Sequence, residues 1–123
     1  PFLRPGRRIA GKLAESNRAG LVVKKVGAVT SIYSAAIQLP PVVIRAIARA
    51  AGVHIWLESD DALYADNRFI GIHAASDGEK RIRLPQDRKV FDALSGASVP
   101  TDGQTISLKM KRAETSLLRL EER

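Results

Sequence analysis

The chain of 123 residues contains no cysteine, which excludes disulfide bridges and thiolate metal sites and fits a reducing cytoplasm. No apolar run approaches the roughly 20 residues that a membrane span needs, so we expect no membrane association. The N-terminus lacks the apolar stretch of a signal peptide and begins at Pro1 without an initiator Met. We therefore expect a processed chain, or one cut from something longer.

Acidic residues are scarce at the N-terminal end, where the net charge of +7 is concentrated. Residues 1–25 contain seven Lys or Arg and one acidic residue, Glu15. A nucleic-acid surface usually has aromatic or amide side chains between its basic residues, and this segment has one aromatic residue, Phe2. We interpret it as a solvated basic arm and disfavour nucleic-acid binding, which would depend on Arg4, Arg7, Arg8 and Lys12.

Residues 1–52 show the pattern of a β-β-α segment. Residues 9–14 could form a short strand, and residues 21–26 and 29–34 are β-branched runs around Gly27-Ala28, which predicts a hairpin. Pro41 suits a first helical position, and Gly52 suits a C-terminal cap, so we expect a helix over residues 41–51.

Residues 53–123 show the pattern of a small antiparallel β domain. Strands are expected over residues 53–57, 63–65, 69–74, 81–84, 90–94, 106–111 and 116–121, with turns between them. The Ser76-Asp77-Gly78-Glu79 segment is a strong hairpin signal. The fold class predicted is α+β, mainly β: a short β-β-α segment followed by an antiparallel β-sandwich or partial barrel.

His54, Trp56 and Tyr64 are the candidates for ligand binding. His54 and Trp56 would share one face of a strand, and a Trp beside polar groups can stack on a sugar ring. The alternative, which we favour, is that the single Trp of a small sandwich fills its core or packs against a neighbouring domain.

The remaining polar residues give no catalytic or metal motif. The acidic patch of Glu58, Asp60, Asp61 and Asp66 lacks the glycine and the bidentate Glu of a calcium loop, so a solvated turn is favoured. His73 has no second His nearby and is interpreted as structural. No Gly-x-Ser-x-Gly elbow or phosphate-binding glycine loop occurs, and we expect no catalytic residue, metal or cofactor.

A family resemblance covers roughly residues 20–121. The strongest part spans residues 39–84 and contains these segments: Ala51-Gly52-Val53-His54-Ile55-Trp56, Asp60-Asp61, Ile72-His73-Ala74, Gly78-Glu79-Lys80 and Leu84-Pro85. These segments resemble the C-terminal end of bacterial glycoside hydrolases similar to the β-galactosidases of family 42. Residues 22–27 and 31–34 resemble the last strands of the α/β domain that precedes that end, and residues 90–96 and 118–121 also fit.

The resemblance implies a noncatalytic accessory module, or a free-standing relic of one. In such enzymes the catalytic carboxylates lie on a (β/α)8 barrel of at least about 200 residues, so they have no matching positions here. The partner would be the missing parent domain or further copies in a homo-oligomer. Two alternatives stay open: an independent carbohydrate-binding module, and a basic module that binds nucleic acid or another partner.

Overall fold

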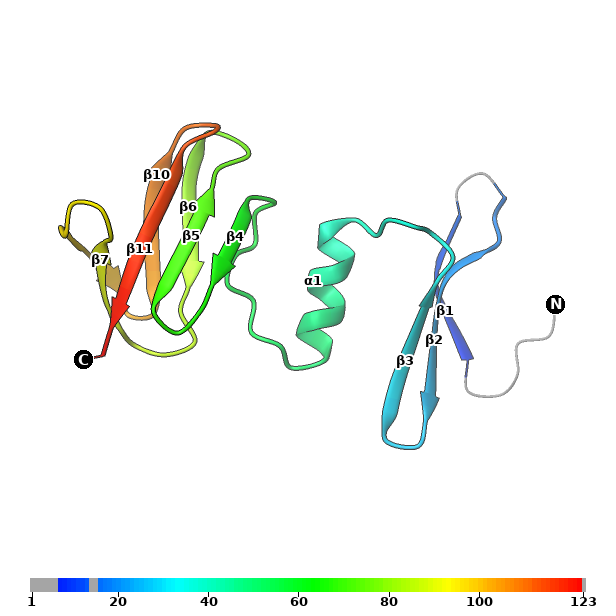
Figure 1. Ribbon diagram of the computed structural model, residues 1–123. Helices are drawn as coiled ribbons and strands as arrows, with labels where there is room; N and C mark the ends of the chain where they lie inside the picture. The colour runs from blue at the N-terminus through cyan, green and yellow to red at the C-terminus, as the bar shows by residue number, and fades with distance from the viewer. Residues whose placement is uncertain (1–6, 14–15, 123) are drawn as a thin grey trace. The chain divides into compact units, whose positions relative to one another are not determined.

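The computed structural model describes residues 7–13 and 16–122, and it is α+β and mainly β (Figure 1). Its elements, in chain order, are β1 (Arg7–Lys12), β2 (Ala19–Val26), β3 (Val29–Ser34), α1 (Pro41–Ala50), β4 (Ala62–Ala65), β5 (Phe69–His73), β6 (Gly78–Arg83), β7 (Lys89–Asp92), β8 (Ser98–Val99), β9 (Thr101–Asp102), β10 (Thr105–Met110) and β11 (Thr115–Glu121). Among the described residues, no helix has both the length and the apolar character to cross a membrane.

The chain divides into two compact units, one up to Ile44 and one from Arg45 onward. The division falls inside α1. We predicted the boundary between the two parts at Gly52, a few residues further along the chain. Each unit is described separately below.

The first unit contains one antiparallel sheet in the order β1-β2-β3. The β2–β3 hairpin forms as predicted, with Gly27 at φ 60° in the turn, a conformation that glycine adopts without steric cost. The expected strand over residues 9–14 is found as β1, two residues earlier, while Ala14 lies outside the described residues. Both edges of this sheet, β1 and β3, lack a further strand among the described residues.

α1 begins at Pro41 and ends at Ala50, as the sequence predicts to within a residue. Gly52 follows at φ 76°, and the amide of Val53 donates to the Ala48 carbonyl at 2.9 Å, which gives the helix a glycine-based C-terminal cap. None of the ten residues of α1 is fully buried.

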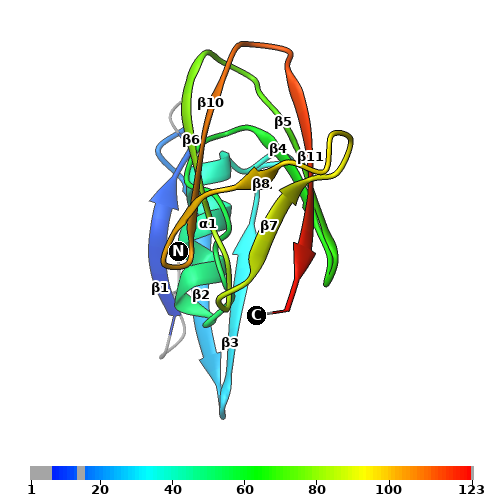
Figure 2. The same ribbon diagram turned by 90° about the vertical axis from the view of Figure 1, so that its left-hand side faces the viewer.

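The second unit is a β-sandwich of two sheets, seen edge-on in Figure 2. One sheet has the order β4-β5-β11-β7-β8 and the other β6-β10-β9. Alternate side chains of both sheets point inward and meet in one core. The core is formed by Leu57, Ile70, Ile72, Ala74, Ile82, Leu84, Val90, Ile106, Met110, Leu118 and Leu120.

The predicted hairpin at residues 76–79 is wrong. β5 and β6 are joined by this turn but do not pair: β5 pairs with β4 and β11, while β6 pairs with β10. The turn instead carries the chain from one sheet to the other (Figure 1). Turn residues specify a reversal of direction, but the sheet that the next strand joins is decided by the core, which holds Ile70 and Ile72 on one side and Ile82 on the other.

The expected strand over residues 53–57 is not regular. Leu57 forms a single antiparallel bridge with Ile82, and the Arg83 amide donates to the Trp56 carbonyl at 2.8 Å. The segment thus lies beside β6 without completing a ladder. The short strands β8 and β9, which the sequence pattern did not indicate, pair with β7 and β10.

Candidate functional site

His54 and Trp56, two of the three predicted ligand-binding residues, contact each other. Their rings meet edge to face, with centroids 5.2 Å apart and planes at 85°. The His54 Nε2–H donates to the Arg83 carbonyl at 2.8 Å, which holds the imidazole against β6. Trp56 is half-buried and packs against the core, as the structural interpretation of the sequence expects.

Trp56 also lines a hollow of about 180 Å³ on the sandwich. Polar side chains surround the indole there: Asp66, Asn67, Gln86 and Arg88. Tyr64, the third predicted residue, lies on β4 with 80% of its surface exposed and is not part of this lining. The structure therefore brings two of the three residues together and places the third elsewhere.

Three carboxylates of the acidic patch, those of Glu58, Asp60 and Asp66, are solvent-exposed as predicted, and each has specific contacts. Glu58 pairs with Arg49 at 2.6 Å, and Asp60 pairs with Arg45 at 2.7 Å. Asp66 accepts hydrogen bonds from the amides of Arg68 and Phe69, both at 2.7 Å. These backbone hydrogen bonds, from Arg68 first, lower the pKa of Asp66.

The solvated-turn prediction is wrong for Asp61, because its side chain is only 1% exposed. It accepts from Lys80 Nζ at 2.9 Å, from Ser59 Oγ at 2.5 Å and from the Ala75 amide at 2.7 Å. Burial raises the pKa of this carboxyl, but the hydrogen bonds and the charge of Lys80 outweigh burial, so the pKa lies below its usual value. Lys80 is 3% exposed and also donates to Ser76 Oγ at 3.1 Å.

Within the described part of the chain, no three His, Asp or Glu side chains are grouped so as to hold a metal ion. His73 forms a hydrogen bond between its Nδ1 and Thr115 Oγ1 at 2.8 Å, across the β5–β11 pair. We find the lone histidine in the structural setting that the sequence suggested.

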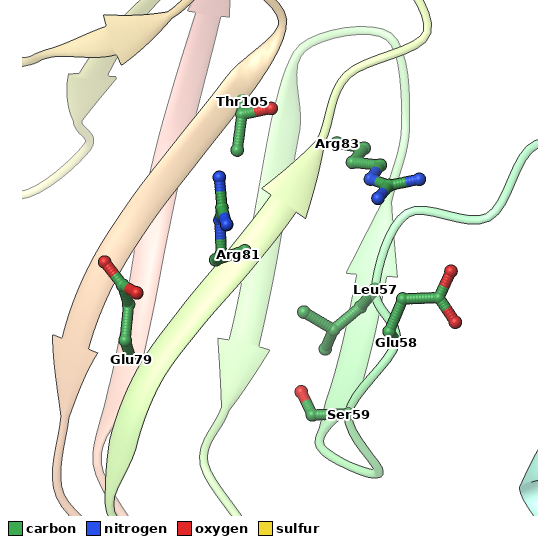
Figure 3. A pocket seen from close by; sticks show the side chains of 7 residues that line it. All are labelled: Leu57, Glu58, Ser59, Glu79, Arg81, Arg83 and Thr105. Atoms are coloured by element: carbon green, nitrogen blue, oxygen red, sulfur yellow. The ribbon is translucent and has the colours of Figure 1, made fainter.

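The outer face of the three-stranded sheet of the sandwich carries a surface feature that no sequence pattern indicated. A hollow of about 330 Å³ lies there, lined by Leu57, Glu58, Ser59, Glu79, Arg81, Arg83 and Thr105 (Figure 3). The alternation of Arg81, Ile82 and Arg83 indicated that two arginines share one face, but nothing in the sequence identified the strand opposite them.

A second surface feature lies on the first unit. One face of its sheet, which we name the Tyr33 face, is made of register partners that share a side: Ile9, Val22, Val26, Val29 and Tyr33. Val22 and Tyr33, with Lys24 and Ser31, line a hollow of about 420 Å³. Tyr33 is 68% exposed.

The fold is that of a mainly β protein, with a β-sandwich in one unit and a three-stranded antiparallel sheet in the other. Comparisons with known protein families, with curated proteins and with solved structures find no match to this chain.

Proposed function

We propose that the chain is a noncatalytic accessory module of a larger glycoside hydrolase, of the kind similar to the β-galactosidases of family 42. The observation that carries the proposal is the exposure of the hydrophobic side chains of the first unit. Among its described residues, no hydrophobic side chain is buried, whereas the sandwich buries eleven. A three-stranded sheet without a covered apolar face is marginal in water, so this sheet needs a neighbour.

The exposed apolar residues of this unit are numerous. Eight large hydrophobic side chains are at least 36% exposed: Ile9, Val26, Val29, Ile32, Tyr33, Ile37, Val42 and Ile44. The open strands β1 and β3 also present unpaired backbone groups, which favour pairing with another strand. Both features fit the last strands of an α/β domain, which the sequence resemblance implies for this segment.

The charges of the first unit favour a different chain segment over a second copy of the same face as its neighbour. Residues 1–44 contain seven Lys or Arg and one acidic residue, Glu15. A twofold interface would bring identical basic surfaces together, and like charges across an interface oppose association. We therefore assign the Tyr33 face and the open edges to the preceding α/β domain of a parent enzyme.

The contacts of the acidic residues support a noncatalytic role. Glycoside hydrolysis uses two carboxylates about 5–10 Å apart across a cleft, one of them with a raised pKa. Here Glu58, Asp60 and Asp61 are each paired with a basic residue, and the pKa of Asp61 is lowered. We expect no turnover of chromogenic galactosides by the pure chain; turnover that is lost in the D60A or D61A variant would contradict this role.

The proposal is tested by hydrogen exchange on the pure chain together with sedimentation. We expect a monomer whose β2 and β3 amides exchange much faster than those of β5 and β11, and whose β2 and β3 amides become protected when the upstream polypeptide is co-expressed. Equal protection of all four strands in a monomer would refute it. A dimer that protects β2 and β3 would assign the neighbour to a second copy instead. The coding sequence upstream of Pro1 gives a direct check, because the proposal requires a barrel in frame.

A second candidate function is carbohydrate binding by the sandwich itself. The observation in its favour is the hollow where Trp56 is surrounded by acid, amide and guanidinium side chains, a combination that suits stacking and hydrogen bonding to a sugar. It predicts that galacto-oligosaccharides change the fluorescence of Trp56, and that N67A weakens this response while Y64A does not. A flat titration would exclude it.

A further inference from the structure

Three side chains on the outer face of the β6–β10 pair supply the chemistry of an anion site. Arg81 and Arg83 lie two residues apart on β6 and therefore on one face. Thr105 lies directly opposite Arg83, and Ser107 lies opposite Arg81. The inward positions between them, Lys80, Ile82 and Ile106, are buried, so this face carries the polar side chains of both strands.

The two guanidinium groups have no partner among the residues that the structure describes. Neither Arg81 nor Arg83 forms a side-chain hydrogen bond or an ion pair with another described residue. Other arginines of this unit are paired, as Arg45, Arg49 and Arg119 are. An oxyanion can accept charge-assisted hydrogen bonds from unpaired guanidinium groups such as these.

The carboxylates near the hollow do not cancel this charge. Glu58 is already paired with Arg49 at 2.6 Å. Glu79 lies opposite Lys109 in the register of the two strands, so one acid faces one base there. The positive charges of Arg81 and Arg83 therefore remain in excess on this face.

The shape of the hollow adds a place for the rest of a ligand. Figure 3 shows Arg81 aimed toward Thr105, and both side chains line the hollow. Arg83 extends to the other side of β6, and as an exposed side chain it changes rotamer on a fast timescale. A volume of about 330 Å³ suits a small organic molecule.

We propose that this hollow binds a small organic anion through a carboxylate or phosphate group. Arg81 and Thr105 hold the oxyanion, and Arg83 adds a second charged donor. This proposal does not rest on the accessory role of the chain, since it concerns the sandwich alone.

The test is a titration of the full ¹⁵N-labelled chain, followed by NMR, with inorganic phosphate, glucuronate and uncharged glucose. We expect saturable shifts of the amides of Arg81, Arg83 and Thr105 with phosphate or glucuronate, and none with glucose. The R81Q and R83Q variants are each expected to weaken binding by about tenfold or more, because each loses a charge-assisted hydrogen bond. R81K, which keeps the charge but not the bidentate geometry, should fall between wild type and R81Q.

K89Q is the matched control, because Lys89 is an exposed lysine on β7, in the other sheet of the sandwich, and does not line the hollow. It should change the affinity by less than about twofold. An equal loss in K89Q and R81Q would show diffuse surface attraction and overturn the proposal. Equal shifts with glucose, or no saturation by about 50 mM anion, would overturn it as well. Phosphate binding without glucuronate binding would assign the site to phosphate esters, and the reverse to carboxylates.

Discussion

The buried pair of Lys80 and Asp61 should be decisive for the stability of the sandwich. At 2.9 Å and an effective dielectric constant of about 20, the attraction between the two charges is about 6 kcal/mol. Burying each ion costs several kcal/mol, so the pair as a whole contributes little, but removing one partner leaves the other charge buried and uncompensated. We expect K80M to lower the free energy of unfolding by about 3–5 kcal/mol at pH 7.

The same pair predicts a pH dependence. Because the pKa of Asp61 is lower in the folded state than in the unfolded state, its contribution to stability is present above about pH 4–5 and is lost as the pH falls through the folded pKa. In K80M the carboxyl loses the ammonium group, and burial then raises its pKa relative to wild type. The difference in stability between wild type and K80M should therefore narrow at acid pH.

Urea unfolding followed by Trp56 fluorescence measures both effects at pH 7 and at about pH 4. The control is K109M, because Lys109 is an exposed lysine on the outer face of β10. Its free energy of unfolding should lie within about 0.5 kcal/mol of the wild-type value. The double variant D61L/K80M should be more stable than K80M, although the Ala75 amide loses its acceptor at a cost of about 1–3 kcal/mol. A K80M variant within about 1 kcal/mol of wild type, or single effects that simply add in the double variant, would refute the reasoning.

Two further predictions concern the core and the end of the helix. I82A should lower the free energy of unfolding by about 2–5 kcal/mol, because Ile82 is fully buried between the two sheets. I32A, on the exposed sheet of the first unit, should lower it by less than about 1 kcal/mol. Urea midpoints compare the two variants. G52A should lower the free energy of unfolding by about 1–2 kcal/mol through the positive φ of this residue alone, since a Cβ there meets no atom within 4 Å. G71A, in a strand, should be neutral or slightly stabilising. Equal effects of the two substitutions in thermal unfolding would contradict this account.

Local patterns in the sequence were sufficient for most elements. The β2–β3 hairpin follows from its glycine turn, α1 follows from Pro41 and Gly52, and the burial of Ile70 and Ile72 follows from their alternation in β5. These features depend on residues within a few positions of each other, where steric and hydrogen-bonding preferences act directly.

Features that depend on distant residues could not be predicted. Asp61 has the sequence pattern of a turn residue. Its partner, Lys80, comes 19 residues later in the chain and contacts it only once β6 is in place in the folded sandwich. The hollow at Arg81 likewise requires the register of β6 against β10, which places Thr105 opposite Arg83. Side-chain charge alone gave no indication of either arrangement.

Two of the four connections that cross between the sheets have a consequence for how the sandwich folds. The β5–β6 and β10–β11 turns are joined to each other: the Arg112 amide donates to Asp77 at 2.6 Å, and Ala74 and Ala113 are linked by a backbone hydrogen bond at 2.8 Å. Each strand leaving these turns pairs with a strand from the other connection, so His73 meets Thr115 across 42 positions of chain. The chain segment between these two turns must close into a loop before the β5–β11 and β6–β10 pairs can form. We therefore expect folding of the sandwich on a millisecond-to-second timescale, slower than a protein built from local hairpins.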